Sequence, residues 1–577
     1  MEKRIIRRVI PLLADGLMSG LRPVLQRIYL ARGVRSSEEL DYSLTRLLPY
    51  RELAGMPQAV EVLAGALERN ERIVVVGDFD ADGATGCALT VRGLRALGAA
   101  DVHYIVPNRF EYGYGLTPEI VAITLPCRPQ VLVTVDNGIS SIDGVAAARR
   151  AGVRVVITDH HLPGPALPEA DAIVNPNRPG DLFPSKCLCG VGVMFYVLTA
   201  LRAHLRASNW FAGKGIPEPN LASFLDLVAL GTVADVVPLD HNNRILVAQG
   251  LARIRAGRCV PGIRALASVA GRDLGRLSAR DLGFAVAPRL NAAGRLADMS
   301  LGIECLLAED EGTASGLAAR LDGLNGERRD IEAKMHGEAI GSLASLGSRE
   351  INETAYGVCL FHEDWHQGVV GIVAGRIRER INRPVIAFAL ASENEIKGSA
   401  RSVAGVHIRD TLDAVATAHP GLISKFGGHA MAAGMVLRRA DLAAFARAFD
   451  LEVERRISPE ALHDVVYTDG ELGASDLGLE MAEALEHAGP WGQGFPEPLF
   501  DGEFDLQAPR VVADRHLKFV LRTDQSRHSV AGIAFNAVEA GWRLEARRVR
   551  LTYRLAINEY QGSRSPQLIV EHALPLP

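Results

Sequence analysis

The clearest pattern in the chain is an alternation of short apolar runs with amphipathic stretches between residues 72 and 175. The apolar runs are rich in valine and isoleucine, which is typical of buried strands. They predict strands over 73–77, 102–106, 131–135, 154–158 and 172–174. The stretches between them predict helices over about 86–97, 117–123 and 141–151. This alternation indicates an α/β domain with a parallel sheet.

The rest of the chain divides into regions with patterns of their own. Residues 1–70 are mainly helical in pattern, and residues 316–346 predict one long helix. Residues 350–450 repeat the strand–helix alternation in a second, smaller α/β unit. After residue 455 the chain changes to strand-like runs that suit a small β-barrel, at 509–513, 517–522, 529–535, 548–556 and 566–571.

A chain of 577 residues is too long for one hydrophobic core, so we expect several domains. The patterns place their limits as follows: an N-terminal helical segment over 1–50, a large α/β domain over 51–315, a connecting helix over 316–346, a smaller α/β domain over 347–450 and a β-barrel over 455–577.

Three of the predicted strands end in acidic or histidine residues. Asp78, Asp80 and Asp82 follow the first strand, Asp136-Asn137-Gly138 follows the third and Asp159-His160-His161 follows the fourth. In open α/β sheets, ligands bind at the carboxyl ends of the strands, so these groups should meet at one edge of the sheet. Carboxylates brought together repel one another and lose hydration, and a divalent cation removes that cost. Hard oxygen ligands of this kind favour Mg²⁺ or Mn²⁺.

A fourth acidic motif lies further along the chain. An apolar helical run over 224–230 is followed by Gly231-Thr-Val-Ala-Asp235. Taken alone, each motif has a second interpretation, a polar turn whose acids and histidines are simply solvated. Four such motifs placed after regular elements are hard to explain in that way, so we expect a metal site.

Composition says little about the partner of this protein. The apolar content of 48% and the charged content of 23% are ordinary for a globular chain. The formal net charge is −5, so any nucleic-acid surface must come from local positive charge. Seven scattered cysteines form no disulfide or zinc pattern, which favours a reducing cytoplasm. No uncharged apolar run reaches about 18 residues, and we expect no membrane span.

The order of the four motifs resembles that of the DHH phosphoesterase superfamily. From about residue 20 to its end, the chain resembles the RecJ family within that superfamily, whose members are bacterial exonucleases specific for single-stranded DNA. The resemblance implies a parallel-sheet DHH catalytic domain joined by a long helix to a smaller α/β DHHA1 domain. It also implies that the C-terminal barrel is OB-like.

The resemblance further implies a site for two divalent ions, Mn²⁺ or Mg²⁺, and phosphodiester hydrolysis without a protein nucleophile. Our hypothesis is that Asp136 bridges the ions, because it is centrally placed and ends its own strand, that His161 contacts the scissile phosphate and that Asp159 orients His160. The expected catalytic residues are then Asp136, His160 and His161. The expected metal ligands are Asp78, Asp80, Asp82, Asp136, His160 and Asp235. For Asp78 the alternative is a group that contacts a ligand and not the metal itself.

For the reaction, the resemblance implies digestion of single-stranded DNA from 5′ to 3′ to mononucleotides, in recombination and mismatch repair. It implies action beside a single-strand-binding protein and a RecQ-type helicase. We expect a monomer in the cytoplasm with no membrane contact. Residue spacing by itself indicates neither the polarity nor the partners.

Residues 251–295 hold nine arginines, two acids and no lysine. Arginine forks suit phosphate groups, but the same residues could form a solvated face whose partners lie elsewhere in the fold. The segment 288–296, Pro-Arg-Leu-Asn-Ala-Ala-Gly-Arg-Leu, matches a RecJ-like signature. We expect Arg289, Asn291 and Arg295 to face the substrate backbone, although a structural role is an open alternative for each.

A phosphate pocket is expected in the second α/β unit. Residues 365–376 open a helix with glycines near its start, and residues 426–434 contain a Gly-Gly pair that we expect to precede a helix. Such glycines let backbone N–H groups approach a phosphate; the alternative is a tight turn with a C-cap glycine. In the resemblance, this is the DHHA1 domain, which binds substrate opposite the metal site. The expected contacts are Arg401, Ser402, Gly427, Gly428 and His429.

Positive charge and aromatic rings gather in the predicted barrel. Residues 510–564 hold eleven arginines and lysines against five acids. Cations along a groove with rings for base stacking suit a single-strand-binding OB fold, although some of the rings must belong to the barrel core. The rings are Phe519, Phe535, Trp542, Tyr553 and Tyr560. Residues 490–499 before the barrel are expected to form a rigid connector.

Two other functions compete with this interpretation. The first is a DHH phosphoesterase that acts on short RNA oligonucleotides or small phosphates, against which the added barrel argues. The second is a non-catalytic DNA-binding scaffold on a decayed core. Decay should delete metal ligands, and all four motifs are intact here.

Overall fold

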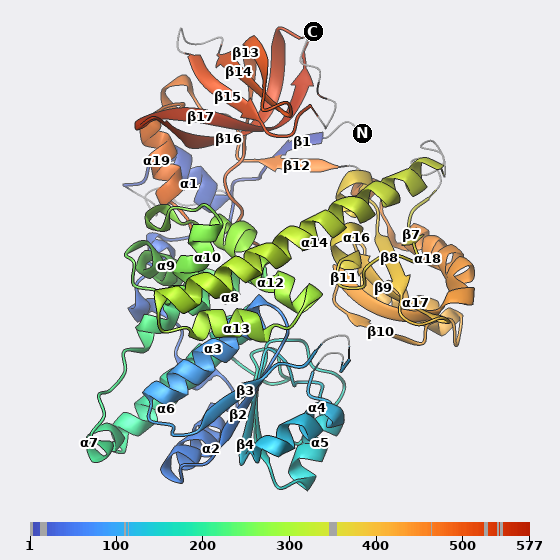
Figure 1. Ribbon diagram of the computed structural model, residues 1–577. Coiled ribbons are helices and arrows are strands. Elements are labelled where there is room, and N and C mark those ends of the chain that lie inside the picture. Colours follow the sequence, from blue (N-terminus) through green and yellow to red (C-terminus); the bar gives the residue numbers. More distant parts are fainter. Residues whose placement is uncertain are drawn as a thin grey trace. The chain divides into compact units, whose positions relative to one another are not determined.

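The computed structural model describes residues 4–11, 20–108, 111–112, 115–345, 355–462, 464–523, 529–538, 542 and 546–576. The chain forms two compact units (Figure 1). One, the small unit, consists of Met1–Arg4 and Gly323–Val466, and the other, the large unit, consists of Ile5–Asp322 and Tyr467–Pro577.

The large unit is built on a five-stranded parallel sheet with the strand order β3-β2-β4-β5-β6. The predicted parallel sheet is therefore confirmed. Its strand order reverses at β2, which places the topological switch point between β2 and β4. The strands are β2 (Ile73–Gly77), β3 (Val102–Ile105), β4 (Val131–Val135), β5 (Arg154–Thr158) and β6 (Ala172–Val174).

Helices cover both faces of this sheet, as its uniformly buried valines and isoleucines require. On one face, α4 (Pro118–Thr124) and α5 (Ile142–Arg150) enclose a core with the apolar side chains of the strands. On the other face lie α2 (Met56–Glu68), α3 (Ala81–Ala96) and α6 (Gly190–Ala207).

Helix α3 begins at Ala81, not at about residue 86 as the sequence predicted. Asp80 caps it, since its Oδ1 accepts hydrogen bonds from two backbone N–H groups of the first turn. Gly83 and Gly86 lie inside the helix. A Cβ at Gly83 would lie 2.4 Å from the carbonyl oxygen of Asp78. These glycines therefore permit close packing within the helix.

A helical layer completes the core of the large unit. Its main elements are α8 (Leu225–Ala234), α9 (His241–Arg255), α10 (Pro261–Val269), α12 (Ala287–Leu296) and α13 (Ser300–Leu307). A π-helical turn, Leu282–Val286, precedes α12. The predicted long helix is α14 (Glu311–Ser345), which begins five residues earlier than expected; residue 346 lies outside the described residues.

The N-terminal segment is less helical than predicted. Arg4–Arg7 form a strand, β1, and the only full α-helix among the described residues before α2 is α1 (Pro23–Leu30). Short 3-10 turns lead from α1 to α2. The prediction of a mainly helical region over residues 1–70 is therefore only partly right.

The small unit is an α/β domain of its own, as predicted. Its mixed sheet has the order β10-β11-β9-β8-β7, in which β7 and β8 are parallel. The helices are α16 (Val370–Ile381), α17 (Ile408–Ala418) and α18 (Leu442–Arg456). The strands are β7 (Val358–Phe361), β8 (Val385–Leu390), β9 (Glu395–Arg401), β10 (Lys425–Gly428) and β11 (Ala432–Arg438).

The C-terminal region closes into the predicted β-barrel, with the strand order β13-β14-β15-β17-β16. The first strand begins at Phe500, earlier than expected, and from Glu503 to Gln507 exposed polar residues alternate with buried Phe504 and Leu506. The strands are β13 (Phe500–Val512), β14 (His516–Arg522), β15 (Ser529–Ala534), β16 (Arg548–Tyr560) and β17 (Ser563–Pro575).

The connector before the barrel packs on the N-terminal helix of the large unit. Trp491 and Phe495 stack with ring centroids 5.2 Å apart, and Tyr29 of α1 stacks on both rings. A buried ion pair joins Arg32 to Asp469 at 2.6 Å. Aromatic stacking and a hydrogen-bonded buried pair fix the barrel on the body of the large unit.

Candidate metal centre

Acidic side chains from three strands and two helices meet at the switch point of the large sheet. Asp78 follows β2, Asp136 follows β4 and the Asp159-His160-His161 motif follows β5. Asp82 lies in the first turn of α3, and Asp235 caps the carboxyl end of α8. The crevice beyond the strand ends at a switch point is where open α/β sheets bind ligands.

Three overlapping groups bring their potential ligand atoms within 4.8 Å of one another. Asp136 belongs to two of the groups and His160 to two. The groups are Asp78, Asp80 and Asp136; Asp82, His160 and Asp235; and Asp136, His160 and His161. Every metal ligand expected from the sequence is thus brought to one place.

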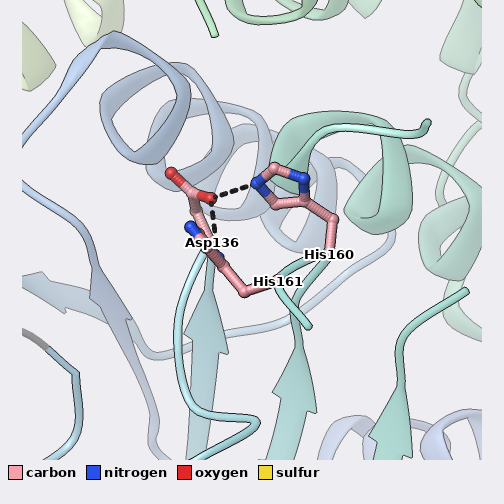
Figure 2. Close-up of side chains that lie close together, drawn as sticks. All are labelled: Asp136, His160 and His161. Atoms are coloured by element: carbon pink, nitrogen blue, oxygen red, sulfur yellow. Dashed lines mark hydrogen bonds and ion pairs between the residues drawn. The ribbon is translucent and has the colours of Figure 1, made fainter. Parts of the chain in front are cut away.

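Figure 2 shows Asp136 beside His160 and His161. The Nε2 of His160 lies 3.0 Å from Oδ1 of Asp136 and 3.5 Å from Oδ2 of Asp235. The Nδ1 of His161 lies 3.9 Å from the same Asp136 oxygen. Asp136 is 1% exposed and has a φ of +64°, a conformation that aspartate tolerates better than most residues.

Asp159 holds the backbone of His160 and His161 in place through hydrogen bonds. Its carboxylate accepts hydrogen bonds from the backbone N–H groups of His160, His161 and Ile139. It also lies 2.8 Å from the ring Nδ1 of His161. The sequence predicted that it orients His160, whereas the ring it contacts here is that of His161. Burial would raise the pKa of Asp159, but its hydrogen bonds and the histidine charges outweigh burial and lower it.

His161 responds to the same contact in the opposite sense. Burial would lower the pKa of its imidazole. The hydrogen bond and the negative charge of Asp159 outweigh burial, so the net shift is upward.

Asp82 has a second role at the start of α6. Its two carboxylate oxygens accept hydrogen bonds from the backbone N–H groups of Gly190 and Val191, at 2.6 and 2.9 Å. Any side chain at Gly190 would collide with Asp136, because a Cβ there would lie 2.5 Å from the Cβ of Asp136. The positive end of α6 therefore partly compensates the acidic cluster.

The cluster is electrostatically unfavourable without a cation. Burial raises the pKa values of Asp82, Asp136 and Asp235, and the neighbouring carboxylates raise them further. The Oδ2 atom of Asp235 is buried and has no hydrogen-bond partner among the described residues. The carboxylates are buried and repel one another, and the Asp235 oxygen lacks a hydrogen-bond donor in the described part of the chain. These features fit hard divalent cations of the Mg²⁺ and Mn²⁺ type.

Sequence reasoning missed the residues that hold this cluster in place. The Nδ2 of Asn137 donates to the carbonyl oxygens of Val76 and Val135, which ties the ends of β2 and β4 together. Asn177 donates to the carbonyl oxygen of His160, and Asn175 to that of His161. Asn137 follows the predicted ligand Asp136 directly, so the sequence could have indicated its supporting role. No local pattern in the sequence indicates such a role for Asn175 or Asn177.

Five of the nine arginines in the segment 251–295 pair with acids, and four of these acids lie in other parts of the chain. For these five arginines the structure favours the structural alternative, because a carboxylate lies at the fork that a phosphate would need. The pairs are Arg264 with Glu311, Arg272 with Asp281 at 3.2 Å, Arg276 with Glu559, Arg280 with Glu497 at 2.9 Å and Arg289 with Asp322 at 2.8 Å.

The three contacts expected from the signature at 288–296 lie on α12. Arg289 donates to the carbonyl oxygen of Ala285 in addition to its ion pair. The Oδ1 of Asn291 accepts a hydrogen bond from the backbone N–H of Ala81. Arg295 is half-buried near the end of the same helix. Arg289 and Asn291 thus contact the protein itself.

In the small unit the expected phosphate contacts fall on neighbouring strands. Arg401 ends β9 and donates to the carbonyl oxygen of Ala400, and burial lowers its pKa. The Ser402 hydroxyl is buried and donates to the carbonyl oxygen of Val406. Gly427 and Gly428 belong to the β10–β11 hairpin, so the prediction that they precede a helix is wrong. The exposed His429 lies in the turn of that hairpin.

The aromatic residues of the barrel divide between core and surface. Phe519 and Tyr553 are buried in the barrel core. Phe535 and Tyr560 are 53% and 69% exposed, which leaves their faces accessible for stacking. Trp542 is half-buried against His572.

Among the described residues, no helix has the length and apolar character needed to cross a bilayer.

Family models match three parts of the chain. The DHH family N-terminal domain matches residues 72–232, the DHHA1 domain matches residues 350–455 and the RecJ OB domain matches residues 468–572. The first contains the sheet and most of the acidic cluster, the second the small unit and the third the barrel.

Curated relatives match over almost the whole chain. The single-stranded-DNA-specific exonuclease RecJ of Dickeya dadantii is 55% identical over 97% of both chains. The RecJ exonuclease of Escherichia coli is 51% identical over 99% of both chains.

A solved structure has the same fold. The crystal structure of RecJ from Thermus thermophilus in complex with Mn²⁺ covers all of this chain and 80% of its own, with a TM-score of 0.82 at 32% identity. The corresponding Mg²⁺ complex has a TM-score of 0.75 at 30% identity.

Proposed function

The chain belongs to the RecJ family of single-stranded-DNA-specific exonucleases, and on that premise we propose how its residues carry out the reaction. The protein is a single-stranded-DNA-specific exonuclease with Mn²⁺ or Mg²⁺ as its cofactor. The observation that carries the assignment of roles is the convergence of five aspartates and two histidines at the switch point of the sheet.

Two divalent ions would be held by the overlapping groups of the cluster. Asp136 is our candidate for the bridging ligand because it is shared between two groups and lies at the end of a central strand. When bound, the ions supply Lewis-acid activation of water and neutralise charge on the phosphate oxygens. The remaining ligands would be Asp78, Asp80, Asp82, His160 and Asp235.

The residues of the chain have separate tasks around these ions. Asp159 would fix the ring of His161 through its 2.8 Å contact with Nδ1 and so orient that ring toward the scissile phosphate. The upward-shifted pKa of His161 favours a protonated ring that donates to a phosphate oxygen. His160 is held by its contact with Asp136 and by Asn177 on its carbonyl oxygen. None of these tasks needs a covalent intermediate with the protein.

The 5′→3′ polarity is part of the proposal. A terminal phosphate held in the small unit would set the direction of digestion. Arg401 and His429 are its candidate ligands, since an anion would offset the cost of burying the Arg401 charge. Exposed rings on the barrel, Phe535 and Tyr560, would stack on bases of the strand that follows.

We also propose a setting for the reaction. The protein would act as a monomer in the cytoplasm, in DNA recombination and mismatch repair, beside a single-strand-binding protein and a RecQ-type helicase. Support for the DNA substrate comes from the barrel that matches the RecJ OB domain.

Digestion of one labelled oligonucleotide tests this function. The strand carries a label at its 5′ end or its 3′ end and is incubated with Mn²⁺, with Mg²⁺ or with EDTA, with a blunt duplex as control. We expect immediate release of a labelled 5′ mononucleotide, dependent on metal and absent with the duplex.

Two outcomes would revise the proposal. Shortening from the 3′ end would overturn the polarity and the terminal-phosphate role of Arg401 and His429. Hydrolysis of small phosphates or short RNA without digestion of DNA would keep the metal centre and move the substrate to the competing DHH phosphoesterase function.

A further inference from the structure

Helix α12 supplies a hydrogen-bond acceptor to the turn that carries the first three aspartates. The Oδ1 of Asn291 accepts a 2.8 Å bond from the backbone N–H of Ala81, the first residue of α3. The first N–H groups of a helix have no partner within the helix. Asp80 Oδ1 accepts from the next two, those of Asp82 and Gly83, at 3.0 Å each. Asn291 therefore provides the acceptor that the capping aspartate does not.

A second contact joins the same face of α12 to the same turn. A Cβ built on Gly294 would lie 1.8 Å from the carbonyl oxygen of Phe79. At that distance no side chain fits, so the backbone of α12 lies against the backbone of the turn. Asn291 and Gly294 are three residues apart and share one side of the helix. Together they contact the two residues that separate Asp78, Asp80 and Asp82.

We propose that Asn291 and Gly294 are positioning residues of the metal centre, in place of the DNA contact that the sequence suggested for Asn291. They act through Ala81 and Phe79, and they set the spacing of the carboxylates on either side. The inference rests on the proposed metal centre, and it adds a support from a helix that follows the aspartates by more than 200 residues.

Loss of the Asn291 acceptor has a direct chemical consequence. The Ala81 N–H would lose its acceptor, and the turn that carries Asp80 and Asp82 would lose one of the contacts that hold it in place. Loss of a group that orients metal ligands weakens metal binding. The outcome would be weaker metal binding, with no direct effect on groups that bind the DNA backbone.

Three variants separate this role from a substrate contact. Asn291→Ala removes the acceptor, and Gly294→Ala places a methyl group against the Phe79 carbonyl oxygen. Asn291→Asp keeps an oxygen acceptor for Ala81. The matched control is Asn394→Ala, at an exposed turn of the small unit. Thermal unfolding of each purified protein verifies that it is folded.

The first readout is Mn²⁺ binding by calorimetry, without DNA. We expect Asn291→Ala and Gly294→Ala to bind Mn²⁺ about 10- to 100-fold more weakly, as for other groups that orient metal ligands. Asn291→Asp should stay within about threefold of the natural chain because it keeps the acceptor. Unchanged Mn²⁺ affinity in Asn291→Ala would overturn the proposal.

The second readout is binding of a single-stranded oligonucleotide in EDTA, where the metal plays no part. Affinity and its salt dependence should match the Asn394→Ala control in all variants. A loss of affinity in Asn291→Ala with a reduced salt slope would instead indicate a backbone contact and would overturn the positioning role.

The third readout is amide hydrogen exchange in the peptide over residues 78–84. We expect faster exchange in Asn291→Ala and protection in Asn291→Asp. If the natural chain itself bound no Mn²⁺, the proposed metal centre would fail, which is distinct from a failure confined to the Asn291 variants.

Discussion

Asp136 combines three constraints at one residue. It is buried, it has a positive φ, and it lies 3.0 Å from His160. Gly190 packs against Asp136 so closely that no side chain fits at Gly190, because a Cβ there would lie 2.5 Å from the Cβ of the aspartate. A residue so confined and so strongly repelled by other carboxylates is costly in the absence of a cation.

Asp136→Asn should therefore have opposite effects on activity and on stability. Asparagine keeps the shape and tolerates the positive φ, but it removes the charge. We expect turnover to fall by about 100-fold or more, with binding of single-stranded DNA in EDTA retained. The metal-free variant should unfold at a higher temperature than the natural chain, since one source of repulsion is gone.

Nuclease assays and thermal unfolding in EDTA measure both effects. Asp143→Asn, at an exposed position on α5, serves as the control for loss of one negative charge. Full activity of Asp136→Asn would show that the bridging role is misassigned.

Metal removal should be visible in stability as well as in activity. A ligand that binds only the folded state stabilises it by about 2.7 kcal/mol when present at 100 times its dissociation constant. We expect EDTA to abolish digestion and to lower the unfolding temperature of the large unit, and Mn²⁺ to reverse both. A natural chain whose unfolding is indifferent to Mn²⁺ would speak against the cluster as a metal centre.

At the scale of the element, α14 is notable for its glycines. The boundary between the two units falls within this helix, between Asp322 and Gly323. A Cβ built on Gly323 or Gly326 meets no atom of the described residues within 4 Å. Close packing therefore does not explain these glycines, and each weakens the helix.

Replacing both glycines should strengthen the helix without a clash. We expect Gly323→Ala with Gly326→Ala to stabilise the protein by about 1–2 kcal/mol in total, from the lower backbone entropy of alanine in the unfolded chain. Urea unfolding followed by circular dichroism measures the gain. Gly375→Ala, in α16 and also free of contacts among the described residues, gives the gain from propensity alone. Destabilisation by the double change would mean that the glycine backbone is needed.

At the scale of the whole molecule, the large unit is held together by contacts between its two ends. Arg7 near the N-terminus donates to Asp501 on the first barrel strand, with bonds of 2.9 to 3.2 Å. Thr468 and Arg550 donate to the same buried carboxylate. Burial would raise the pKa of Asp501, but these hydrogen bonds outweigh it and hold the pKa below its ordinary value.

This tie makes stability depend on pH in a definite direction. A carboxylate with a depressed pKa stabilises the fold at pH values above its unfolded pKa of about 3.9, and this contribution disappears as pH falls through the lower folded pKa. We expect Asp501→Asn to be less stable than the natural chain at pH 7 by about 1–3 kcal/mol. The difference should shrink below about pH 4.

Urea unfolding over a series of pH values measures this difference. Asp505→Asn, exposed on the same strand, is the control and should follow the natural chain at every pH. A difference for Asp501→Asn that stays constant down to pH 3 would contradict the ionic origin of the tie.

Much of the fold and of the candidate site was predictable because the signals are local. The runs at 73–77, 131–135 and 154–158 are apolar enough to be buried on both faces, so they become adjacent parallel strands. The acids that follow them then share one sheet edge by topology alone. The start of α3 was misplaced because a candidate metal ligand can also cap a helix: Asp80 caps α3 and belongs to a group that could hold a metal ion.

The sequence by itself determined the types of domain and the positions of the main strands along the chain, since each depends on neighbours a few positions away. It also indicated the acidic and histidine motifs that meet at the candidate metal centre, because three of them directly follow strands. The tertiary structure decided which polar groups meet across long separations. It pairs Arg289 with Asp322 and Asn291 with Ala81, which are contacts of the structural kind that the sequence had left open for these two residues. Such pairings depend on the three-dimensional path of the chain, because the sequence around a charged or amide side chain does not indicate which distant residue it will contact.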